Sequence, residues 1–156
     1  MTRHAPMPDD VLALFRTRLG LEEVPPEGPF VPPETLPDIV AALKEMGFLL
    51  FLYCAATHWP ATENRPEAFT VAYGLRRPGP GSSTARLRVR IPADGSIPTL
   101  SGLFAGADWQ EREQYDLVGI HFEGHPDLRR LMLPEDWEGH PLRKDYAIDT
   151  HHFPWR

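Results

Sequence analysis

The sequence predicts a two-layer α+β fold, in which a mainly antiparallel sheet packs against helices and an extended, proline-rich C-terminal tail follows. Two observations support this class. Segments with the three- to four-residue apolar spacing of amphipathic helices lie on either side of three strand-like segments. Two of these strands are joined by residues 76–84, a glycine- and proline-rich stretch typical of a hairpin loop.

Two helices are expected before the strands. The first spans residues 9–19 and ends before Gly20, with acidic residues in its first turn, where the helix dipole favours them. The second spans residues 36–46, and Thr35 with Asp38 three positions later resembles a capping box. Both helices carry an apolar stripe that a sheet can cover.

Three strands are expected next. Residues 48–56 are apolar on both faces, so we expect this segment at the centre of the sheet. Residues 69–75 alternate large and small side chains, and residues 86–91 alternate arginines with Leu87, Val89 and Ile91, as in a strand with one buried face. The single cysteine, Cys54, falls in the apolar strand and is expected to be a small buried hydrophobic residue.

Beyond the strands, residues 98–104 are expected to form a short helical turn and residues 107–118 a helix that ends at Gly119. Prolines at four later positions interrupt residues 120–156. This part of the chain cannot bury a core of its own, so it must lie over the domain or over another protein.

We therefore divide the chain into three parts. Residues 1–35 hold the first helix and a proline-rich connector, residues 36–119 form the α+β domain, and residues 120–156 form an extended partner-binding tail.

The composition excludes several classes of function. A net charge of −6 argues against nucleic-acid binding, because such domains usually carry a basic face. One cysteine excludes an internal disulfide and a cysteine-ligated zinc or iron–sulfur site within the chain. The longest apolar run, residues 48–56, is shorter than the roughly 20 residues of a membrane-spanning helix. We expect association with a membrane only through a partner.

Residues 108–146 hold the densest group of charges, histidines and glycines. Helical spacing places Trp109, Glu113 and Asp116 on one apolar face together with Leu117 and Ile120. Buried carboxylates need partners, and a bidentate arginine is the best available, so we expect structural ion pairs. The candidate partners are Arg129, Arg130 and Arg143, which follow two Gly-His-Pro turns.

Three catalytic alternatives are weaker. The paired carboxylates could serve as an acid and a base, as in glycoside hydrolysis, but no sugar-binding platform accompanies them. His121 and His125, with Glu123 or Asp127, could bind zinc or nickel, but Gly124 and a proline break the helix that would bring them together. The chain has no nucleophile elbow, phosphate-binding loop or dinucleotide fingerprint. We predict no catalytic, cofactor-binding or metal-binding residue, and a small His/carboxylate metallohydrolase stays as the enzyme alternative.

The same segment resembles the 30 kDa subunit family, which supplies the C subunit of the proton-pumping NADH:quinone oxidoreductases, that is, of respiratory complex I. Its residues follow the family signature in order: Glu111-Arg112-Glu113, Asp116, Leu117-Val118, His125, Arg129 and Leu131-Met132. The stretches 124–130 and 138–146 also look like the family, and weaker similarity covers residues 36–147.

The resemblance implies a non-catalytic subunit of the peripheral arm, on the cytoplasmic side of the cell membrane. It would support assembly and position the quinone-site (D-like) and terminal iron–sulfur (B-like) subunits, in electron transfer from NADH to quinone coupled to proton translocation. NADH, FMN, iron–sulfur clusters and quinone would belong to partner subunits, with no cofactor in this chain. An equivalent domain of a membrane-bound hydrogenase or of a ferredoxin-linked complex is the alternative.

On this interpretation the charged motif has structural or interface roles, which we assign to Glu111, Arg112, Glu113, Asp116, Gly119, His125, Arg129, Arg130, His140, Arg143 and Lys144.

Overall fold

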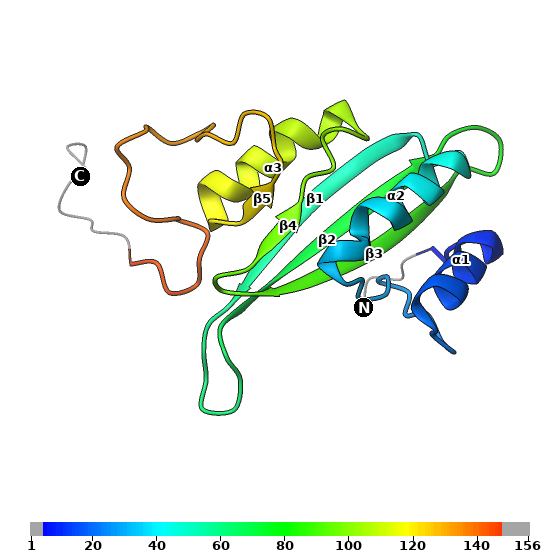
Figure 1. The fold of residues 1–156 in the computed structure, drawn as a ribbon, viewed down its shortest axis with the longest axis horizontal. Helices are drawn as coiled ribbons and strands as arrows, with labels where there is room; N and C mark the ends of the chain where they lie inside the picture. The colour runs from blue at the N-terminus through cyan, green and yellow to red at the C-terminus, as the bar shows by residue number, and fades with distance from the viewer. Residues whose placement is uncertain (1–4, 148–156) are drawn as a thin grey trace.

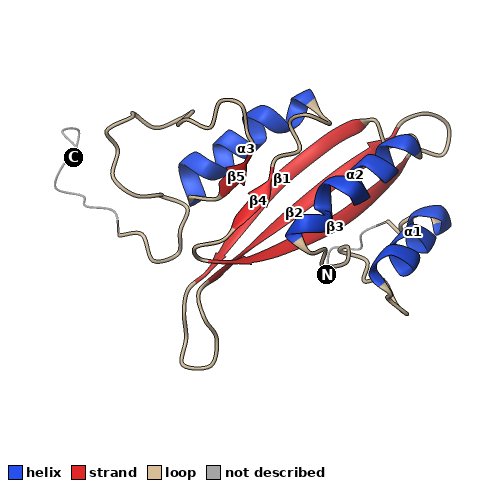
Figure 2. Ribbon diagram, in the orientation of Figure 1, coloured by secondary structure: helices blue, strands red, loops and turns tan. Residues whose placement is uncertain are grey.

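The computed structural model describes residues 5–147, in which helices lie across one face and along one edge of a three-stranded antiparallel sheet (Figure 1). The strands β1 (Leu50–Trp59), β2 (Ala68–Arg77) and β3 (Ser83–Pro92) form this sheet in the order β1-β2-β3. The helices are α1 (Asp9–Leu19), α2 (Leu36–Glu45) and α3 (Ala105–Val118). Figure 2 shows the helices and strands in separate colours. The predicted α+β class is confirmed.

The first two helices lie where the sequence predicts them. The capping box before α2 is wrong, however. A short 3₁₀ helix (Pro33–Thr35) leads directly into α2, so Thr35 has helical backbone angles and its hydroxyl donates to the carbonyl of Pro32 (3.1 Å) instead of capping the helix. The third helix begins at Ala105, two residues earlier than expected.

The β2–β3 hairpin has the predicted alternation. Val71 pairs with Val89 and Tyr73 with Leu87, and all four side chains are buried in the core beneath the helices. The arginines of β3 lie on the other face. The Arg88 side chain donates to the carbonyl of Gly28 (3.0 Å) in the proline-rich connector, whose backbone also bonds to the backbone of Arg88 and so covers the outer edge of β3.

The prediction that β1 lies at the centre of the sheet is wrong, because β2 is the central strand and β1 is an edge. Helix α3 lies along this edge (Figure 1). The amide oxygen of Gln110 accepts a hydrogen bond from the N–H of Cys54 (2.7 Å), and that of Gln114 accepts one from Ala56 (3.0 Å). Four residues of helix and two of strand each advance by about 6 to 7 Å, so the two side chains match the two free donors. Cys54 is buried, as predicted.

A short parallel pair, β4 (Ser96–Pro98) and β5 (His121–Glu123), completes the structure, and no pattern in the sequence indicates it. Ile120 and Phe122 are buried, so the core continues past the end of α3. Between β4 and α3, the N–H groups of Leu103 and Phe104 both donate to the carbonyl of Leu100 (2.9 Å each), which makes a single helical turn.

The glutamine contacts predict a loss of stability in a Gln114→Ala variant. Removing the acceptor leaves the N–H of Ala56 without its partner at a half-buried strand edge, so the free energy of unfolding should fall by about 1 to 2 kcal/mol in chemical denaturation. Glu113→Ala, one position away on the same helix, is the matched control and should change it by less than about 0.5 kcal/mol. Equal effects of the two substitutions would contradict the edge-capping role.

Candidate functional site

Helix α3 turns charged side chains toward the protein interior. Glu111, Arg112 and Asp116 are buried, whereas Trp109 is 65% exposed. The predicted face of Trp109, Glu113 and Asp116 is therefore wrong, and Glu111 replaces Glu113 as the second buried acid. The two glutamines that bind the edge of β1 fix the rotation of the helix about its axis. The spacing of residues within the helix does not predict this contact, because β1 is distant in sequence.

Asp116 is the most highly coordinated of these acids. Its Oδ2 atom accepts hydrogen bonds from three consecutive backbone N–H groups, those of Leu131 (3.0 Å), Met132 (2.7 Å) and Leu133 (2.9 Å). Its Oδ1 atom accepts one from the Arg130 guanidinium (2.7 Å), so the predicted pairing with arginine is confirmed here. Burial acts to raise the pKa of Asp116, but these donors outweigh it and lower the pKa below its ordinary value.

Residues 124–146, which we call the belt, contain no helix or strand. In Figure 1 they pass beside α3 and loop out beyond its C-terminal end. Arg130 links two of the belt's turns, because its guanidinium also donates to the carbonyls of Trp137 (2.8 Å) and Gly139 (3.2 Å). The His140 Nδ1 atom lies 2.9 Å from the backbone oxygen of Asp116. One helical residue thus holds residues 130–133 and residue 140 of the belt.

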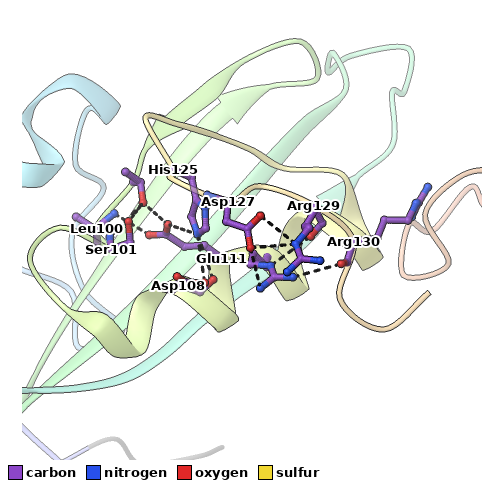
Figure 3. Close-up of polar contacts among 10 residues, drawn as sticks. Leu100, Ser101, Asp108, Glu111, His125, Asp127, Arg129 and Arg130 are labelled. Atoms are coloured by element: carbon purple, nitrogen blue, oxygen red, sulfur yellow. Dashed lines mark hydrogen bonds and ion pairs between the residues drawn. The ribbon is translucent and has the colours of Figure 1, made fainter. Parts of the chain in front are cut away.

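Glu111 lies in a different environment, shown in Figure 3. It accepts a hydrogen bond from the Thr99 hydroxyl (2.5 Å) and one from the N–H of Leu100 (2.7 Å). Both donors come from the segment after β4, so this buried acid is not paired with an arginine. Burial raises the pKa of Glu111 above its ordinary value despite these two hydrogen bonds.

The buried ring of His125 fixes the first Gly-His-Pro turn against α3. Its Nδ1 atom accepts from the N–H of Asp127 (3.1 Å), and its Nε2 atom lies 3.3 Å from the backbone oxygen of Asp108. The Nε2 atom is also 3.9 Å from Oε2 of Glu111 (Figure 3). His121 is exposed on β5, so the two histidines considered as metal ligands do not face a common point in the described structure.

The two arginines nearest this turn behave differently. Arg112 is buried, and its guanidinium lies 3.4 Å from the carbonyls of both Arg129 and Arg130 and 3.5 Å from Oδ2 of Asp127. The Arg129 side chain is exposed and pairs with Asp127 at 2.9 Å. The prediction that it pairs with an acid of α3 is therefore wrong.

The second Gly-His-Pro turn packs on the end of α3. Arg143 donates to the carbonyl of Val118 (2.9 Å), and its guanidinium lies 5.0 Å from the centre of the Phe69 ring. Gly119 ends the helix with a φ of 85°, and a Cβ atom there would lie 2.6 Å from Cδ2 of His140 and 2.8 Å from Nη2 of Arg143. The position therefore requires glycine for both its backbone angle and its space.

A clasp around His58 is a feature that the sequence does not predict. This buried ring on β1 lies 2.9 Å from Glu67 through Nε2, and its Nδ1 atom accepts from the N–H of Lys144 (3.2 Å) and is 3.4 Å from Asp145. The two carboxylates face opposite nitrogens of the ring, and Nδ1 already accepts a hydrogen bond from the backbone. These contacts of His58 with Glu67, Lys144 and Asp145 therefore hold the end of the belt on β1. A lone histidine in a strand gives no signal of partners 86 residues away.

A depression of about 700 Å³ opens beside Thr99, the residue bonded to Glu111, between the N-terminal ends of α2 and α3. Its lining is mostly small or apolar, with Asp38, Asp108 and the hydroxyl-bearing Thr99 and Ser101 among the polar residues. In the described part of the chain this lining includes no histidine, cysteine or lysine that could act as a base or nucleophile.

Residues 30–152 match the sequence profile of the family described as respiratory-chain NADH dehydrogenase, 30 Kd subunit. The chain belongs to this family. The match covers most of the sequence, including α2, the whole sheet, α3 and the belt. The resemblance carried by the charged motif is confirmed.

Relatives of the 30 kDa subunit family agree with this. The chain is 43% identical to NAD(P)H-quinone oxidoreductase subunit J of Synechococcus sp. (strain WH7803) over 135 residues, 83% of this chain and 71% of that one. It is 40% identical to the C subunit of the NADH-quinone oxidoreductase of Mesorhizobium japonicum over 76% of this chain, and spans 58% of that relative. The solved structure described as Nqo5 of the trypsin-resistant fragment (1-134) is 32% identical, with a TM-score of 0.63, and covers 77% of this chain and 98% of its own.

In this 30 kDa-family chain seven of the motif residues therefore fall into two groups. Five carry buried or half-buried side chains that hold the belt on α3, namely Arg112, Asp116, His125, Arg130 and Arg143. Arg129 and Lys144 are exposed, and a role at an interface stays a prediction for all of them. Within residues 5–147 none of the helices has the length and apolar character needed to cross a bilayer.

Substitution of Asp116 by asparagine should detach the belt. The change keeps the shape but leaves Arg130 and three N–H groups without a charged acceptor, so we expect the free energy of unfolding at pH 7 to fall by about 3 kcal/mol. Chemical denaturation measures this loss, with Asp127→Asn on the exposed side of the belt as the control. A loss of similar size in the control would contradict the assignment.

The same variant predicts a pH dependence. The fold lowers the pKa of Asp116, so its contribution is complete above the ordinary carboxyl pKa of about 3.9 and is lost as the pH falls through the lower folded-state value. The stability difference between wild type and Asp116→Asn should therefore be constant from about pH 5 to 7 and shrink below about pH 4. A difference that grows on acidification has the wrong sign for this site.

Proposed function

We propose that the chain is a non-catalytic subunit in the peripheral arm of a membrane-bound NADH:quinone oxidoreductase, where it supports assembly and positions neighbouring subunits in electron transfer from NADH to quinone coupled to proton translocation. The observation that carries this proposal is that the charged side chains of the family motif make their bonds within this chain. Its acids and bases bind one another and the backbone, and so convert a segment without secondary structure into a fixed surface.

The state of the acids supports a non-catalytic role. Asp116 accepts four hydrogen bonds through its two carboxylate oxygens, which leaves little capacity for a reacting group. Glu111 is bonded through both oxygens to Thr99 and Leu100 beneath the surface. An acid and base that act on a substrate must reach it directly or through one water, and these two face different structural partners.

The cofactors of the complex are assigned to partner subunits. Cys54 is buried at the β1 edge and its thiol pKa is raised well above the ordinary value by burial, which disfavours the thiolate that binds a metal or cluster. We propose that NADH, FMN, the iron–sulfur clusters and quinone bind elsewhere in the complex, and that this chain contacts the quinone-site (D-like) and terminal iron–sulfur (B-like) subunits. It would reach the cytoplasmic side of the membrane through them.

The alternative is the equivalent domain of a membrane-bound hydrogenase or a ferredoxin-linked complex. The names of the relatives support the proposal, since both specify a quinone oxidoreductase that uses NADH or NAD(P)H.

Purification of the native complex through a tag on this chain, followed by mass spectrometry, tests the proposal. We expect stoichiometric recovery of a quinone-site subunit and an iron–sulfur subunit, together with NADH:quinone activity. Recovery of a hydrogenase large subunit instead would favour the alternative, and recovery of the chain free of redox subunits would refute the proposal.

Charge reversal of Arg143 should separate assembly from chemistry. Arg143→Glu removes the bond to Val118 and places a carboxylate near Glu67, so the belt should loosen and the amount of assembled complex should fall several-fold on native gels. Turnover per assembled complex should not change. Arg90→Glu, an exposed reversal on β3, is the control, and normal assembly with lost turnover in Arg143→Glu would contradict the non-catalytic role.

A further inference from the structure

The belt has an inverted polarity. Its charged residues Arg130 and Arg143 turn inward onto α3, whereas the apolar side chains of Met132 and Leu142 are 61% and 60% exposed. Trp109, on the adjoining face of α3, is also largely exposed. A loop that meets only water normally shows the opposite arrangement.

These three residues, which we call the outer apolar row, follow α3 in order. Trp109 lies against Arg112, whose guanidinium is 5.8 Å from the ring centre. The N–H of Met132 is bound by Asp116, and the N–H of Leu142 donates to the carbonyl of Leu117 (2.9 Å). From residue 109 to residue 117 the helix rises by about 12 Å, so the row is attached along a short length of helix.

Rigid attachment distinguishes this row from scattered surface side chains. A single exposed leucine or methionine is ordinary, but here the backbone at Met132 and Leu142 is held by hydrogen bonds to adjacent residues of α3. The apolar groups are therefore presented in fixed positions, and a partner would lose little conformational entropy of this chain on binding. Aromatic and methionine side chains of this kind are enriched in the centres of protein interfaces.

Charge around the row indicates the kind of partner. Between residues 127 and 145 five exposed acids, Asp127, Glu135, Asp136, Glu138 and Asp145, outnumber two exposed bases, Arg129 and Lys144. Arg129 is already paired with Asp127. A second copy of the chain would bring two acidic margins together, with a net charge of −6 on each molecule, so a partner with basic margins fits better.

We infer that the outer apolar row of Trp109, Met132 and Leu142 is the surface through which the belt contacts a different subunit of the complex, one whose surface there is apolar at its centre and basic at its margin. This inference rests on the proposed function and gives it a location: the inward charges shape the belt and the outward apolar groups bind the neighbour.

The test is a Met132→Ser/Leu142→Ser double variant, expressed as the tagged full chain in the native complex. Both side chains are exposed, so the purified subunit should keep its melting temperature, while its retention in the complex should fall by at least about tenfold in apparent affinity. Phe30→Ser is the matched control, since Phe30 is 47% exposed beside β3 and away from the belt. Glu135→Lys/Asp136→Lys should also weaken retention, because it places positive charges against the basic margin of the partner subunit.

The outcomes separate the two claims. If the wild-type chain purifies with the oxidoreductase subunits and the double variant does so equally well, the inference is overturned and the proposed function stands. If the wild-type chain purifies without them, both are overturned. A photo-crosslinking residue at position 132 provides an independent check: an adduct with another subunit of the complex supports the inference, and an adduct with a second copy of this chain overturns it.

Discussion

A single carboxylate organises the belt at the C-terminal end of the described chain. Asp116 binds three consecutive backbone N–H groups and the guanidinium of Arg130, and Arg130 in turn binds two carbonyls further along the belt. A segment without helix or strand must satisfy its backbone groups by other means, and here the side chains of α3 supply them. Charge-assisted bonds of this kind are stronger than neutral ones, which suits a loop that buries little apolar surface.

That anchor works because α3 itself is held in one rotation. Gln110 and Gln114 bind the open edge of β1, Glu111 is bound by the segment after β4, and Gly119 lets the chain reverse where His140 and Arg143 pack. The helix therefore links the sheet on one side to the belt on the other. The relation of fold to function follows from this arrangement: the domain supports a fixed outer surface, and the family to which the chain belongs consists of subunits of a larger oxidoreductase.

Features that depend on neighbours in sequence were predictable, and those that depend on distant contacts were not. The bounds of α1, the β2–β3 hairpin and the pairing of Asp116 with a downstream arginine follow from local spacing and charge. The apolar run of β1 suggested a central strand, whereas its position at the edge depends on glutamines more than fifty residues away. Helical periodicity predicted Glu113 as the buried acid and not Glu111, because the rotation of α3 also depends on these distant glutamine contacts. The motif was sufficient to recognise the family, but its spacing does not tell which of its residues face inward.

Hydrogen–deuterium exchange on the purified chain tests the central claim most directly, namely that the motif builds the belt onto α3 within one molecule. The amides of Leu131, Met132, Leu133 and Leu142 should exchange slowly before any partner is added, because each N–H donates to an acceptor on α3. Exchange of these amides at the rate of an unstructured peptide, with protection only in the assembled complex, would show that the partner and not Asp116 orders the belt, and would contradict the account.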